Sequence, residues 1–174
     1  MKKLIALLIF AVSLFSACAC TAEATHTEDC IRIHIRANSN VDCDQSVKLL
    51  VRDEIIKHLT PVLADCETKS DAKEKISSSI PELTEIADKC LGENGFPYKA
   101  DISLRKEEFP FRKYMDYSFP EGVYDALIIE LGEAEGDNWW CVAFPPLCFI
   151  PEGEDNENFC YKSKIMELIK KARG

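Results

Sequence analysis

The residues with the clearest capacity for chemistry lie between Asn138 and Phe149, in the segment NWWCVAFPPLCF, which holds two adjacent tryptophans and two cysteines. A thiolate is an effective nucleophile beside an imidazole, so Cys141 with His34 as base and Asn38 as orienting group would form a cysteine hydrolase. Zinc binding by Cys141, Cys148 and His34 is the metal hypothesis, but the six-residue gap between the cysteines is not a usual ligand spacing. A cysteine between bulky aromatic residues is more often buried or bridged. We therefore expect no catalytic set, no metal and no cofactor.

The two cysteines of this segment also predict a disulfide. The prolines at 145 and 146 end the pairing of a strand, and if the chain doubles back there, Cys148 can approach Cys141. A disulfide needs a Cα separation of about 5.5 Å, and closing so short a loop stabilises by roughly 2 to 3 kcal/mol. The bridge would fix Trp139 and Trp140 as an exposed aromatic surface for a partner. The alternative is a core strand in which both tryptophans are packed.

A second polar cluster, Arg36-Ala-Asn-Ser-Asn40, lies between a predicted strand and a predicted helix. The unpaired amides of a first helical turn point outward, and such a connection can bind an anion or a partner. Arg36, Asn38 and Asn40 are therefore further candidates for partner binding. The alternative is simple capping, because Asn and Ser form local hydrogen bonds in such connections.

The N-terminus predicts export. Two lysines precede an apolar run from Leu4 to Phe15 and then small residues, which is the pattern of a secretory signal peptide over residues 1–19. Two processing sites compete, one of them a lipobox-like sequence that would leave Cys18 lipidated. Residues 20–29 lack apolar periodicity and indicate a tether. A lipid on Cys18 would be the only expected attachment to a membrane.

Composition indicates one acidic globular domain. The chain has 174 residues, 47% of them hydrophobic, and a formal net charge of -9. This length buries a substantial core without needing cross-links. Nucleic acid is excluded as a partner, because no Lys/Arg-rich stripe offsets the acidity.

The elements that must position these residues follow from periodicity. Residues 31–36 alternate between isoleucines and polar residues, which predicts a half-buried strand with Arg32, His34 and Arg36 on the face away from the core. Helical spacing predicts one helix from Asp42 or Asp44 to about residue 59, stopped or kinked at Pro61. A second helix is expected from Ser70 or Asp71 to Cys90, bent at Pro81.

Further strands are predicted at 98–104, 111–117, 122–131 and 138–144, followed by an acidic loop and an amphipathic helix at 162–171. The order β-α-α-β-β-β-β-α indicates an α+β fold, with a mixed, mainly antiparallel sheet and helices packed on one face. The predicted domain covers residues 30–150, and residues 151–174 form the C-terminal loop and helix.

Five segments together resemble the stage II sporulation protein R family of endospore-forming bacteria. They read IRIHIRANSN, DQSVKLLVRDEI, ENGFPYKADISL, FPEGVYDALIIELGE and GDNWWCVAFPPLCF, and they span residues 31–149. The acidic loop at 132–136 and four cysteines are not part of the family pattern; these cysteines are Cys30, Cys43, Cys66 and Cys90.

The resemblance implies a signalling protein rather than an enzyme. A member of this family is secreted from the forespore into the space between forespore and mother cell. There it activates a membrane-embedded aspartic protease of the mother cell, which processes the sigma-E precursor. Two other functions remain open from the residues: an exported cysteine hydrolase acting on peptide or cell-wall bonds, and an acylated envelope protein with a structural role.

Overall fold

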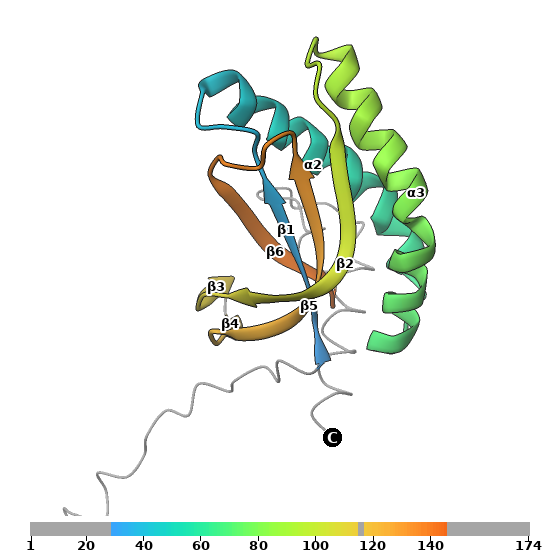
Figure 1. Cartoon of the computed structure of the whole chain (residues 1–174). Coiled ribbons are helices and arrows are strands. Elements are labelled where there is room, and N and C mark those ends of the chain that lie inside the picture. The colour runs from blue at the N-terminus through green and yellow to red at the C-terminus, as the bar shows by residue number, and fades with distance from the viewer. Residues whose placement is uncertain (1–28, 115–116, 146–174) are drawn as a thin grey trace, which may run out of the picture.

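Strand β1 (Ile31–Arg36) is an interior strand of a four-stranded sheet, where its alternating isoleucines reach the core. The computed structural model describes residues 29–114 and 117–145 (Figure 1). The other elements of this part are, in chain order, α2 (Asp42–Leu63), α3 (Lys69–Glu93), β2 (Ala100–Phe109), β3 (Arg112–Tyr114), β4 (Tyr117–Phe119), β5 (Gly122–Leu131) and β6 (Asn138–Phe144). The predicted α+β class is confirmed. The predicted signal peptide, the tether to residue 28, the helix at 162–171 and Cys148 lie outside the described residues.

The sheet is mixed and mainly antiparallel, as predicted. Its strand order is β2-β5-β1-β6. Strand β1 pairs in parallel with β5 and antiparallel with β6, while β2 and β5 form a long antiparallel pair. The first strand of the domain is therefore held between two strands that come much later in the chain.

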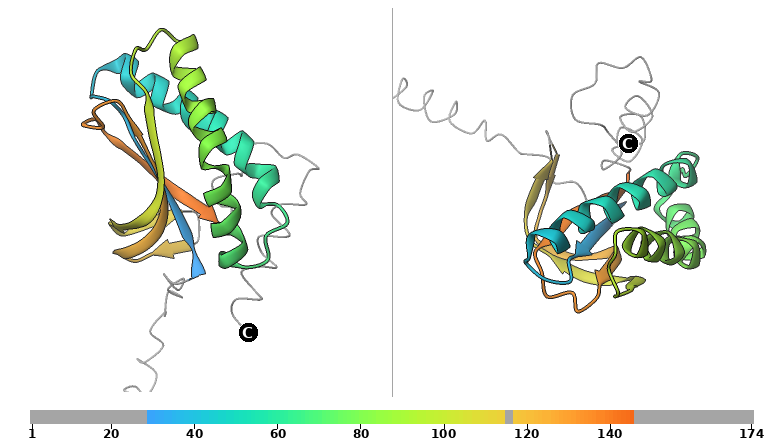
Figure 2. Two further views of the ribbon diagram at one scale, coloured as in Figure 1. Left: turned by 45° about the vertical axis from the view of Figure 1, so that its right-hand side comes forward. Right: turned by 90° about the horizontal axis from the view of Figure 1, so that it is seen from above.

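Both helices cover one face of this sheet, and Figure 2 shows them as a separate layer beside the strands. The odd-numbered isoleucines of β1 point into the space between the layers, where they are at most 1% exposed. The helices fill the same space with side chains at helical spacing. This core includes Val47, Val51, Ile55 and Leu59 from α2, and Ala72, Ile76, Leu83 and Ala87 from α3.

The helices are longer than the sequence predicted. Helix α2 continues past Pro61 to Leu63. A proline in the last turn removes only one hydrogen bond, close to the end of the helix, so the helix tolerates it there. Helix α3 begins one residue earlier than expected, after a capping box in which Thr68 and Asp71 exchange side-chain and backbone hydrogen bonds. Pro81 lies inside α3, and the bend predicted there stays a prediction.

A bent ribbon replaces the predicted strand at 111–117. Strands β3 and β4 continue the register of β2 and β5, since Phe109 pairs with Gly122 and Arg112 pairs with Phe119. Pro110 and Pro120 fall between these two pairs, and a proline has no amide to donate to the ladder. The ladder is therefore interrupted on both strands at the same level. Beyond the interruption the ribbon lies across the sheet face that the helices leave open (Figures 1 and 2).

An ionic clamp attaches the start of α3 to the sheet. The Asp125 carboxylate on β5 lies 2.8 Å from the Lys69 ammonium and 2.8 Å from the Lys73 ammonium. Hydrogen bonds from these two lysines lower the pKa of Asp125 to about 2, against the opposing effect of burial. The ionised carboxylate is therefore the form that the folded protein favours.

This clamp predicts a specific acid sensitivity. Because the folded pKa lies below the unfolded one, the stabilisation is present above about pH 4 and is lost as the pH falls toward about 2. We expect Asp125→Asn to lower the unfolding free energy by about 2 kcal/mol at pH 7 and to weaken its dependence on pH between 4 and 2. Urea denaturation at several pH values measures both effects. Glu93→Gln, at an exposed helical ion pair, is the matched control; an equal loss in both variants would contradict the clamp.

Candidate functional site

The sheet face opposite the helices is buried where the sequence predicted solvent. Arg32 is 0% exposed and His34 is 3% exposed, so the prediction that β1 is half-buried is wrong. The physical reason is the bent ribbon, which places apolar side chains of β2, β4 and β5 over these residues. The apolar residues of this face form a second, smaller core made of Cys30, Phe109, Phe119, Tyr124, Ala126, Ile128 and Val142.

Arg32 lies inside an aromatic cage within this second core. Its guanidinium carbon is 4.5 Å from the ring centre of Phe109 and between 5.0 and 5.7 Å from three others, those of Tyr124, Phe119 and Tyr114. Nε donates to the Cys141 carbonyl oxygen at 3.0 Å, and Nη2 donates to the Tyr114 hydroxyl at 3.3 Å. Nη1 is buried and has no hydrogen-bond partner among the described residues. The cage therefore holds a buried cation through ring faces rather than through a carboxylate.

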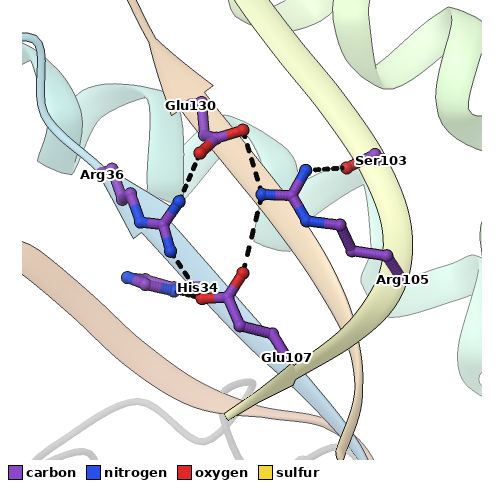
Figure 3. Close-up of polar contacts among 6 residues, drawn as sticks. All are labelled: His34, Arg36, Ser103, Arg105, Glu107 and Glu130. Atoms are coloured by element: carbon purple, nitrogen blue, oxygen red, sulfur yellow. Dashed lines mark hydrogen bonds and ion pairs between the residues drawn. The ribbon is translucent and has the colours of Figure 1, made fainter. Parts of the chain in front are cut away.

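Next to the cage, four charged side chains close into a ring on the same face (Figure 3). Arg36 contacts the Glu107 carboxylate at 2.7 Å and also pairs with Glu130. Arg105 lies 3.1 Å from Glu130 and 3.6 Å from Glu107. Burial raises the pKa of Glu130, but the two arginines outweigh it, and the net pKa lies below its ordinary value. The two carboxylates of this ring are thus neutralised by neighbours.

His34 joins this ring to the tryptophan segment. Its Nδ1 lies 2.6 Å from a Glu107 carboxylate oxygen, while Nε2 is buried with no hydrogen-bond partner among the described residues. The imidazole also contacts two aromatic rings, with its centre 5.3 Å from that of Trp140 and 5.8 Å from that of Phe109. The carboxylate on one side and the rings on the other fix the orientation of His34.

The two tryptophans lie on opposite faces of β6, as the strand period predicts. Trp139 packs against the core beneath the helices, with the Arg52 guanidinium 5.5 Å from its ring centre. Trp140 packs against the second core, with the Arg112 guanidinium 4.3 Å from its ring centre. Both side chains are half-buried. Neither tryptophan is fully exposed, because a core covers each face of β6.

The residues proposed for a cysteine hydrolase are not brought together. In the register of β1 and β6, Cys141 lies opposite Ile33, and His34 lies opposite Trp140. Cys141 therefore points to the helix side of the sheet with Ile33, whereas His34 points to the other side. The zinc hypothesis fails for the same reason, because it also needs Cys141 and His34 on one side of the sheet. The imidazole that would serve either site is separated from the sulfur by the sheet itself.

Cys141 is disulfide-bonded. Its partner lies outside the described residues, since Cys30, Cys43, Cys66 and Cys90 remain thiols. Pairing with Cys148 stays a prediction. Burial raises the pKa of the Cys30 thiol to about 11, which keeps it protonated and unreactive at neutral pH.

The loop after β1 holds the turn between β5 and β6. The side-chain oxygen of Asn38 accepts a hydrogen bond from the Glu133 amide at 2.9 Å, and that of Asn40 accepts one from the Asp137 amide at 2.6 Å. Both asparagines thus have an internal role, but it differs from the local capping that the sequence offered as an alternative: the hydrogen bonds reach a distant turn, and α2 begins after Val41 without a side-chain cap. Their contact with a partner, like that of Arg36, stays a prediction.

A buried carboxylate fixes this loop to the start of α2. Asp44 accepts hydrogen bonds from Ser39 at 2.6 Å, from Tyr98 at 2.7 Å and from Asn38 at 2.8 Å. Burial raises the pKa of Asp44, but these hydrogen bonds outweigh it and hold the pKa below its ordinary value. The loop is therefore rigidly attached on two sides.

The turn approaches this loop so closely that two positions require glycine. A Cβ built on Gly136 would lie 2.3 Å from the Ser39 carbonyl oxygen. A Cβ built on Gly132 would lie 2.2 Å from the Asn38 side-chain oxygen, and Gly132 also has a positive φ of 57°. Any larger residue forces the two loops apart.

Sequence reasoning placed Arg32 on this face but indicated no burial or role for it, and it did not identify Arg105, Glu107 or Arg112. A signal for Arg112 was present in the basic run Phe111-Arg-Lys113 directly after Pro110. The charged side chains of β2 gave no such signal, because only the pairing of β2 with β5 brings them beside β1.

Comparison with known proteins gives one consistent family. The model of the family described as "Stage II sporulation protein R" matches residues 27–154. The protein named stage II sporulation protein R in Bacillus subtilis (strain 168) is 37% identical over 123 residues, which are 71% of this chain and 55% of that protein. The chain thus spans little more than half the length of this relative. No solved structure matches.

The described part of the chain lacks both a membrane-spanning helix and a group of metal ligands. No helix within residues 29–114 and 117–145 is long and apolar enough to cross a bilayer. In the same ranges, no three His, Cys, Asp or Glu side chains are grouped so that they could hold a metal ion.

Proposed function

Since the chain belongs to the stage II sporulation protein R family, we propose that it is an exported signalling protein of sporulation. It leaves the forespore, enters the space between forespore and mother cell, and activates a membrane-embedded aspartic protease of the mother cell. That protease then processes the sigma-E precursor. The protein itself acts by being recognised and breaks no bond.

The observation that best supports a signalling role is the family match, which runs through the whole described body. The arrangement of side chains agrees with it. Cys141 and His34 lie on opposite sides of the sheet, and Cys141 is disulfide-bonded, so the thiolate and imidazole of a hydrolase are not assembled there. Arg36, Arg105, Glu107 and Glu130 neutralise one another in a fixed ring on the sheet face opposite the helices, which suits a rigid recognition surface.

The direct test is to add the purified protein, residues 20–174, to cells that carry the protease and its sigma-E precursor. We expect the precursor to be shortened in these cells and to stay intact in cells without the protease. Turnover of a peptide or cell-wall substrate by the protein alone would overturn the proposal.

Cys141→Ser separates the signal from the hydrolase. A nucleophile is essential in a folded enzyme, whereas loss of a disulfide mainly lowers stability. We expect this variant to trigger precursor cleavage at temperatures where circular dichroism shows that it is folded. A folded but inactive variant would favour the hydrolase.

A further inference from the structure

The surface around β3 carries two positively charged side chains, Arg112 and Lys113. Arg112 and Lys113 form no ion pair with any residue of the described ranges. Glu107 and Glu130, which lie on the sheet face that the helices leave uncovered, are already held by Arg36 and Arg105. Within the described ranges, Arg112 and Lys113 are therefore available to an outside group.

Charge is distributed unequally over the molecule. Acidic residues outnumber basic ones in both α2 and α3, and the turn from Glu133 to Asp137 is also acidic. The helices cover one face of the sheet, whereas β3 crosses the opposite face (Figure 2). An approaching acidic group is repelled by the helix layer and attracted to β3.

The same place also offers aromatic contact area. Phe111 is 56% exposed, and it is the one aromatic residue among the exposed large hydrophobic side chains of the described ranges. Trp140 is half-buried, and Arg112 lies across its ring at 4.3 Å. Aromatic residues and arginine are the side chains most enriched in the energetically important centres of protein interfaces.

The aromatic and charged groups are held in place before any partner arrives. The Tyr114 hydroxyl donates to the Trp140 carbonyl oxygen at 3.0 Å and accepts from Arg32, which ties β3 to β6 through the aromatic cage. A surface that is already ordered loses little conformational freedom on binding.

From these contacts we infer that the β3 surface, made by Phe111, Arg112, Lys113 and Trp140, binds an acidic segment of a protein partner. The inference rests on the proposed function, in which the partner is the extracytoplasmic part of the protease. A protein segment fits better than an anionic membrane. The β3 surface offers a membrane only Arg112 and Lys113, while the acidic helices and turn repel a uniformly negative plane.

The test uses the full chain, produced with its own N-terminal segment in sporulating cells that lack their own family member. The variant Arg112→Glu/Lys113→Glu reverses both charges. The control Lys57→Glu/Lys89→Glu makes the same change in net charge on the helices, where these lysine side chains are 77% and 75% exposed. We expect sigma-E precursor cleavage to fall at least tenfold in the β3 variant and to stay within twofold of the original in the control. Thermal melting of both secreted variants checks that they are folded.

Binding assays identify the occupant. The secreted original protein should bind the purified extracytoplasmic segment of the protease, more weakly at high salt, and the β3 variant should lose this binding. Loss of binding to phosphatidylglycerol vesicles instead would assign the surface to a membrane, and loss of self-association in sedimentation would assign it to a second copy; either result overturns the inference.

If the original protein triggers cleavage and the folded β3 variant does so equally well, the inference about the β3 surface fails while the proposed function stands. If the original protein triggers no cleavage, the proposed function and the inference fail together.

Discussion

Gly136→Ala is expected to lower the unfolding free energy by about 3 kcal/mol, because the new methyl group has no space. Its Cβ would lie 2.3 Å from the backbone carbonyl oxygen of Ser39 and 2.9 Å from the Cβ of Ala37. Backbone atoms cannot rotate away as a flexible side chain does. The loop after β1 and the turn before β6 must therefore separate, which breaks the hydrogen bond from the Gly136 amide to the Ala37 carbonyl oxygen.

A matched substitution controls for the general effect of replacing glycine by alanine. Gly92 lies in the last turns of α3, and a Cβ there would meet nothing within 4 Å. Gly92→Ala should leave stability unchanged or raise it by about 0.5 to 1 kcal/mol, since alanine favours helix. Thermal unfolding should show a fall of roughly 10 °C for Gly136→Ala alone. Equal melting temperatures for the two variants would mean that the loop and the turn are not in contact.

Arg32→Ala is the second large effect, an expected loss of about 4 kcal/mol of unfolding free energy. The substitution empties the centre of the aromatic cage and removes the donors to the Cys141 carbonyl oxygen and the Tyr114 hydroxyl. With the cage empty, β3 and β4 lose their attachment to β1. The near-ultraviolet circular dichroism of the aromatic rings should therefore weaken together with the stability.

Arg32→Met distinguishes the packing of Arg32 from its charge. Methionine restores most of the volume without a buried cation, and buried charges are often replaced by apolar residues at little cost. We expect Arg32→Met to lose less than about 1.5 kcal/mol. Urea denaturation of both variants, with Lys113→Ala as an exposed control on the same ribbon, measures the difference. Equal losses for Ala and Met would show that the cation itself, and not the filling of the cage, holds the ribbon in place.

The two variants also connect stability to signalling. If the β3 surface binds the protease, Arg32→Ala should reduce precursor cleavage even at temperatures where the domain is folded, because the ribbon that carries Arg112 is no longer fixed. Arg32→Met should retain cleavage. This dependence follows from the position of Arg32, which touches the ribbon from beneath and reaches no surface itself.

Local patterns in the sequence determined the class of the fold and most of its elements. The alternation of Ile31, Ile33 and Ile35 was sufficient to predict that one face of β1 packs against a core. Side chains of a strand alternate between two faces, whichever strands it pairs with. The same period placed Trp139 and Trp140 on opposite faces. Helical spacing predicted α2 and α3, although the start of α3 depends on a capping box and the end of α2 lies beyond a proline that its last turn tolerates.

The tertiary structure alone decided what covers the second face of the sheet. Polar residues at alternate positions of β1 predict a solvent face, but Arg32 and His34 are buried by a ribbon whose course depends on two prolines about 80 residues later. Likewise, Asn38 and Asn40 could not be assigned to the turn before β6 from sequence, and the ring formed by Arg36, Glu107, Glu130 and Arg105 joins three strands whose order no local pattern specifies. Periodicity records only which side of a strand is apolar. Which distant segment lies against the polar side is fixed by strand pairing and chain direction, and both are properties of the folded molecule.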